Sequence, residues 1–92
     1  MVVSIDDVLK VYSSILDRSL SYEQADRWAW DKIDLFDKGK LKFDPTDKEE
    51  IIWSLILYLY GIDIPDMEDR SKPARSHLDI IDFLKGKKLY GN

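Results

Sequence analysis

The 92-residue sequence contains no cysteine and only one histidine, three prolines and four glycines. Without cysteine the chain has no disulfide and no thiol nucleophile, and it lacks the commonest ligands of structural zinc. Its longest apolar stretch, Ile51–Tyr60, is interrupted by Ser54 and is too short to cross a bilayer. The first ten residues show no basic segment followed by a long apolar run, so no signal peptide is expected. These absences predict a cytoplasmic protein.

Basic residues are also fewer than acidic ones: the sequence has 14 lysines and arginines and 18 acidic residues, which gives a net charge of −4. Binding to nucleic acid relies on cations that face phosphates, so direct binding to DNA or RNA is not expected. The lysines that could serve it are scattered through a loop (38–42) and the tail (85–88). Hydrophobic residues make up 45% of the chain, and 11 of them are aromatic (3 Trp, 5 Tyr and 3 Phe). A chain of this size buries roughly 60–65% of its surface, so one domain over residues 1–92 is expected.

Helix-capping patterns divide the chain into helices. Ser4, followed by Asp6 and Asp7, predicts a first helix that runs to about Arg18. Ser21 with Gln24 forms a capping-box pattern and predicts a second helix over 22–38, which Gly39 ends. A short link makes these two helices an antiparallel hairpin.

The second half of the chain predicts two more helices. Thr46 with Glu49 is another capping-box pattern, and it predicts a helix over 47–60 that ends at Gly61. A fourth helix is expected from Pro73 or Ser76 to residue 86, with Leu78, Ile81 and Leu84 inward and a frayed tail beyond. The helix over 47–60 is apolar nearly all round, so it should be the central one, covered by the other three.

The predicted fold is therefore all-α, a single-domain bundle of about four helices with a central apolar helix. Trp28 and Trp53 are expected in its core. The segment 39–45 reads as a loop that is anchored by Leu41 and Phe43, because a lone short strand has no evident partner.

The second helix carries the candidate binding site. Residues three or four apart lie on one face of a helix, and this spacing groups four carboxylates around a tryptophan. The residues are Glu23, Asp26, Trp30, Asp34 and Asp37. Its other side carries Ala25, Trp28, Ala29, Ile33 and Phe36, an ordinary core pattern. A large aromatic residue within an acidic stripe is typical of a face that grips a basic protein partner. Two other interpretations stay open: a solvated face with weak local ion pairs, or a Trp30 covered by the tail or by the loop at Gly39.

A second, weaker acidic patch lies in the loop over 62–72. Its partner-binding candidates are Asp63, Asp66, Glu68 and Asp69. The loop lacks the ligand spacing and central glycine of an EF-hand, so no metal is expected. His77 stands alone, and the sequence has no nucleophile elbow, phosphate-binding loop or dinucleotide fingerprint. We therefore expect no cofactor and no enzymatic activity.

Several segments together carry a resemblance to a known class of protein. They are Ala25–Ala29, Asp34, Trp53, Tyr58–Ile64 and Asp79–Leu84. This arrangement, over residues 21–84, resembles small acidic bacterial immunity proteins of polymorphic toxin and contact-dependent growth inhibition systems. The resemblance includes no diagnostic motif, so it transfers no binding residues. It implies an inhibitor of one toxin that acts in the cytoplasm of the producing cell, with a basic toxin domain as partner. The alternative is a small helical adaptor or regulatory subunit of another protein complex.

Overall fold

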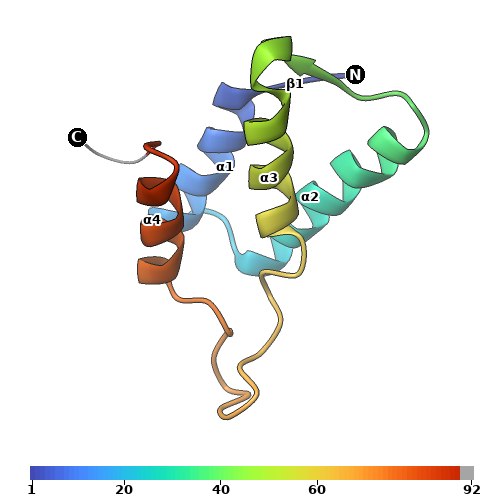
Figure 1. Ribbon diagram of the computed structural model, residues 1–92. Coiled ribbons are helices and arrows are strands. Elements are labelled where there is room, and N and C mark those ends of the chain that lie inside the picture. Colours follow the sequence, from blue (N-terminus) through green and yellow to red (C-terminus); the bar gives the residue numbers. More distant parts are fainter. Residues whose placement is uncertain (90–92) are drawn as a thin grey trace. The chain divides into compact units, whose positions relative to one another are not determined.

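The computed structural model describes residues 1–89 and is mostly helical (Figure 1). The elements are β1 (Val2–Ser4), α1 (Ile5–Leu16), α2 (Tyr22–Asp37), β2 (Lys42–Asp44), the 3-10 helix η1 (Thr46–Lys48), α3 (Glu49–Leu59) and α4 (His77–Gly86). The four α-helices confirm the helical part of the predicted fold, but the strands make it mostly α rather than all-α. Two compact units, Met1–Ile62 and Asp63–Asn92, divide the chain. A single domain over 1–92 stays a prediction.

Serine side chains begin three of the four α-helices. Ser4, Ser21 and Ser76 each accept a hydrogen bond from the backbone N–H three residues later, and the side chain at that later position bonds back to the serine N–H. These reciprocal bonds satisfy N–H groups that have no partner within the helix. The prediction for Thr46 is wrong: Thr46 lies inside η1, and Lys48 precedes α3 without a side-chain cap.

A left-handed residue follows each of the four α-helices, and after α3 it is Gly61, while the other three share one hydrogen-bond arrangement. Arg18, Gly39 and Lys88 have φ values of 68°, 69° and 61°. In each case the next residue donates its N–H to a carbonyl five positions earlier, which is the Schellman arrangement. Gly39 confirms the predicted stop of α2. The other two positions hold residues with a Cβ, for which the left-handed conformation is strained.

A short parallel sheet corrects the prediction of a loop at 39–45. β1 pairs with β2 in the register Val2↔Lys42, Val3↔Phe43 and Ser4↔Asp44. Val3 and Phe43 point to the same side and are both buried, and Leu41 is buried as well. The predicted inward placement of Leu41 and Phe43 is therefore confirmed. The pairing partner that the sequence did not reveal is β1, the strand just before α1.

The core of the unit Met1–Ile62 is built on one side of α3. Ile52, Leu55, Ile56 and Leu59 are completely buried there, and both α1 and α2 contact this helix. The Tyr12 hydroxyl of α1 donates a 2.7 Å hydrogen bond to the Leu55 carbonyl oxygen in the interior. This bond satisfies the one polar atom that Tyr12 brings into the core.

The opposite side of α3 is not covered, which corrects the prediction of an enclosed central helix. Leu57 and Tyr60 are 46% and 53% exposed, and Trp53 is only partly buried. The Trp53 ring packs 4.4 Å from Phe36 of α2, measured between centroids, and 6.2 Å from Phe43 of β2. Trp53 therefore closes the edge of the core instead of filling its centre.

The unit that begins at Asp63 contains a loop and α4. Hydrogen bonds from Asp66 N–H to the Lys72 carbonyl and from Ala74 N–H to the Ile64 carbonyl close the loop. On α4, Ile80 and Leu84 are buried, whereas Leu78 is 72% exposed, so its predicted inward placement is wrong. The predicted frayed tail is described only through residue 89, and residues 90–92 lie outside the described residues. No helix within residues 1–89 is long and apolar enough to span a membrane.

Candidate docking face

The sides of α2 differ in what they contact, and this difference defines the candidate site. Ala25, Ala29 and Lys32 are buried along one side. Two small alanines allow α2 to approach its neighbours closely. The acidic stripe predicted from the sequence lies on the side of α2 away from these three residues. We call it the docking face, and it consists of Glu23, Asp26, Trp30, Asp34 and Asp37. Trp28 and Ile33 are partly exposed and Phe36 is 40% exposed, so the predicted core side is narrower than expected.

Trp30 is the most distinctive residue of the docking face. Its exposed fraction is 54%, which is high for the largest apolar side chain. The structure therefore does not bury Trp30 beneath the loop at Gly39, one of the two covers considered from the sequence. Exposed tryptophan places apolar area in water, and such residues are enriched among interface hot spots.

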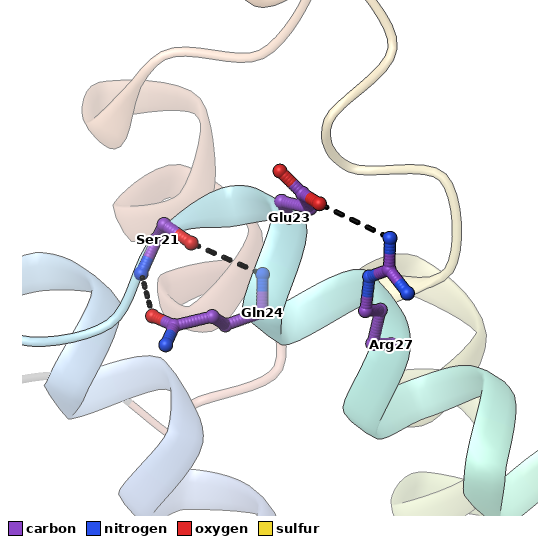
Figure 2. Close-up of polar contacts among 4 residues, drawn as sticks. All are labelled: Ser21, Glu23, Gln24 and Arg27. Atoms are coloured by element: carbon purple, nitrogen blue, oxygen red, sulfur yellow. Dashed lines mark hydrogen bonds and ion pairs between the residues drawn. The ribbon is translucent and has the colours of Figure 1, made fainter.

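Two carboxylates of the docking face are already in local ion pairs. Glu23 accepts from Arg27 at 3.1 Å, next to the Ser21–Gln24 capping box (Figure 2). Asp34 accepts from Lys38 at 2.8 Å, and this hydrogen bond raises the pKa of Lys38. Both pairs are four residues apart on the helix surface, where water screens them and makes them weak. A stronger cationic partner can therefore replace Arg27 or Lys38.

Asp26 has a structural role that the sequence did not reveal. Its carboxylate accepts a 2.6 Å hydrogen bond from the Gly61 N–H, and the contact is partly buried. Gly61 follows α3 with φ of 79°, a left-handed conformation that suits glycine. Asp26 therefore ties the first half of α2 to the end of α3, and it is not a freely exposed steering charge.

The end of α3 adjoins the part of α2 that carries Asp26 of the docking face. The Asp26–Gly61 bond joins the start of α2 to the end of α3, and the Phe36–Trp53 contact joins their other ends. The two helices therefore run antiparallel. Tyr60 precedes Gly61 directly, so this exposed tyrosine lies beside the part of α2 that carries Asp26. Sequence reasoning left Tyr60 out of the site, although its place next to the terminal glycine was visible.

The second acidic patch belongs to the other unit, and half of it orders its own loop. Asp66 accepts from the N–H groups of Glu68 and Asp69, and these bonds lower the pKa of Asp66. Asp69 accepts from the side chain and the N–H of Ser71, which lowers the pKa of Asp69. Asp63 and Glu68 are exposed. Within residues 1–89 no three acidic or histidine side chains are grouped so that they could hold a metal ion.

Lys32 is the residue that the sequence analysis missed. It is 6% exposed, and its ammonium pairs with Asp31 at 3.1 Å. The signal was present in the sequence, since Lys32 follows Ala25 and Ala29 at helical spacing on the buried side.

Comparisons of this chain with protein-family models, with curated proteins and with solved structures found no match.

Proposed function

We propose that this chain is an immunity protein, an inhibitor that binds a basic toxin domain and neutralises it in the cytoplasm of the cell that makes both. The observation that carries the proposal is the exposure of Trp30, at 54%, among the carboxylates of the docking face. Protein interfaces commonly combine aromatic anchors at the centre with polar and charged residues at the rim.

The charge of α2 supports a basic partner. Within residues 22–37, five acidic residues stand against two basic ones, so the helix carries a net charge of −3. Proteins that cut nucleic acids need cations to hold phosphates, and an acidic inhibitor gains association rate when it meets such a surface. The −3 of α2 is the larger part of the overall charge of −4, and it steers a cationic partner toward Trp30.

The apolar part of the interface extends beyond Trp30. Leu57 of α3 and Tyr60, the residue just after α3, are about half exposed, and Tyr60 directly precedes Gly61, to which Asp26 is hydrogen-bonded. A partner that covers Trp30 and Tyr60 together would bury two aromatic side chains, the kind of contact that dominates binding energy. Asp34, Asp37 and Glu23 then supply the charged rim, while Asp26 keeps the two helices in place.

The experiment is co-expression of this chain with the toxin domain that the neighbouring gene encodes, with cell growth as the readout. Wild-type protein should restore growth, and Trp30→Ala should fail to do so while it folds normally. Leu78→Ala is the matched control, because Leu78 is 72% exposed and lies on α4, outside both acidic patches. Growth restored equally by Trp30→Ala would reject the docking face, and no rescue by the wild type would reject inhibition of that toxin.

The charged rim is tested separately by association rates. The double variant Asp34→Asn/Asp37→Asn should slow association and weaken its dependence on salt, because steering charges act before contact. Asp82→Asn on α4 measures the effect of losing one exposed negative charge elsewhere, and twice this effect is the control value for the double variant. In the second patch, Asp63→Asn/Glu68→Gln removes two exposed charges and leaves the loop bonds of Asp66 and Asp69 intact.

A further inference from the structure

A pocket lies among β1, α1 and α2, on the side of α2 away from the docking face. Its cavity volume is about 490 Å³, within the range of roughly 300–1,000 Å³ that is common for small-molecule sites. All of its lining residues lie within residues 1–32, so it belongs wholly to the unit Met1–Ile62. The lining combines apolar side chains, among them Val3, Val11 and Leu20, with one aromatic wall, Trp28.

Lys32 brings a charge into this apolar lining. The lysine is 6% exposed, and its ammonium lies 5.0 Å from the centroid of the Trp28 ring. An ammonium has three N–H donors, and among the described residues one hydrogen bond is found for it, to Asp31. The side chain of this partner, Asp31, is 60% exposed. A buried cation is costly unless its donors are satisfied, so a further acceptor would stabilise Lys32.

The remaining charges in the pocket also favour an anion. Lys10 lines it as a second cation, and Asp7 is its one acidic lining residue. The Asp7 carboxylate already accepts the Ser4 N–H at 3.0 Å in the capping box of α1. The lining therefore carries a net positive charge in a chain whose overall charge is −4.

We propose that this pocket binds a small monocarboxylate with an apolar body. The carboxylate accepts from the Lys32 ammonium, with Lys10 as the second cation, and the apolar body lies against Trp28, Val3 and Val11. A single buried ammonium matches one negative charge. Lysine also binds phosphate as a point charge, but phosphate sites usually add forked guanidinium groups or several converging N–H donors, which the lining does not supply.

The site is a small-molecule pocket and not a second protein-docking surface. Lys32 is buried, so a carboxylate must enter the cavity to reach its ammonium. The pocket and the docking face use different residues of α2, Trp28 and Lys32 against Trp30 and Asp34. Loss of one function therefore does not imply loss of the other, and each can be tested alone.

The test is a titration of the isotope-labelled chain, observed by NMR, with phenylacetate and with octanoate up to about 10 mM. Phenylacetamide is the matched neutral probe. We expect saturable shifts of the Trp28 indole and of the Val3 and Val11 amides with at least one of the two acids, and binding of phenylacetamide about tenfold weaker than that of phenylacetate. Absence of saturable shifts with both acids, or equal binding of phenylacetamide and phenylacetate, would overturn the proposal.

Two variants locate the site, and a third provides the control. Lys32→Met keeps an unbranched side chain that is one atom shorter and removes the charge, and it should weaken acid binding about tenfold or more. Ser14→Phe keeps Lys32 and fills the pocket, and it should abolish binding. Trp30→Ala, on the docking face, should bind the acid as the wild type does. Wild-type affinity in both Lys32→Met and Ser14→Phe would place the acid elsewhere and reject the pocket.

Discussion

Replacing Asp26 with alanine removes the one charged contact found between α2 and the end of α3 in the described part of the chain. The Asp26 carboxylate accepts the Gly61 N–H at 2.6 Å in a partly buried position. A hydrogen bond to a charged group contributes about 1.5–3 kcal/mol, and the lower part of that range applies where water has some access. We therefore expect Asp26→Ala to lower the free energy of unfolding by about 1.5–2 kcal/mol. Asp26→Asn keeps an acceptor without the charge and should cost about 0.5–1 kcal/mol.

Urea denaturation measures both variants. With a slope of about 1–1.5 kcal/mol per molar urea for a chain of this size, Asp26→Ala should lower the midpoint by roughly 1–2 M. Amide hydrogen exchange gives a local readout, because the Gly61 N–H should lose its protection in Asp26→Ala even where the rest of α3 keeps it.

Asp37→Ala is the matched control, since Asp37 is an exposed aspartate of the same helix and should change stability by less than about 0.5 kcal/mol. Equal midpoints for wild type, Asp26→Ala and Asp37→Ala would refute the structural role of Asp26. Asp26 would then return to the set of freely exposed charges that the sequence suggested.

Three further predictions follow from the core, a helix end and the acidic loop. Leu55→Ala should lower the free energy of unfolding by about 2–5 kcal/mol because Leu55 is completely buried. Trp53→Ala, at the edge of the core, should lower it by less than about 3 kcal/mol. A lower urea midpoint for Trp53→Ala than for Leu55→Ala would contradict the burial of α3. Arg18→Gly should raise the free energy of unfolding by about 0.5–1 kcal/mol, because φ is 68° there, and a lower melting temperature would contradict this. Hydrogen bonds in the folded loop lower the pKa of Asp66 below the ordinary aspartate value of 3.8. The stability that these bonds contribute should therefore be complete above pH 3.8 and be lost as pH falls through the lower pKa of the folded state. A transition of the Glu68 amide signal with its midpoint at or above pH 3.8 would contradict this.

Local sequence signals predicted the parts of the fold that local chemistry decides. Ser4, Ser21 and Ser76 begin helices because the serine and its partner are three residues apart, so no distant contact is needed. Thr46 carries the same pattern and failed, because a short 3-10 turn includes it and leaves Lys48 in the capping position. A pattern of two residues does not distinguish these outcomes.

The non-local parts could not be predicted in this way. β2 pairs with a three-residue strand about forty positions earlier, and strands this short carry too little alternation to be recognised. Trp28 and Trp53 were expected in the core because of their size and spacing, but both lie at its edge. Periodicity gives the side of a helix on which a residue lies, and not how far the neighbouring helix extends over it.

The candidate site was predicted in part. The helix, its face and the exposure of Trp30 follow from spacing alone, and the structure agrees with that placement. The engagement of Asp26 with Gly61 depends on how α2 and α3 meet, which no local pattern contains. The binding role of the face and the identity of its partner remain proposals.

The most direct test of the account is the dissociation constant of Trp30→Ala for the proposed partner, a basic toxin domain, measured beside wild type and Leu78→Ala. If Trp30 is the anchor of the docking face, its truncation should weaken binding by at least about 2 kcal/mol, roughly thirtyfold, while the melting temperature and the affinity of Leu78→Ala stay at wild-type values. A folded Trp30→Ala that binds as tightly as wild type would contradict the account and remove α2 as the functional surface.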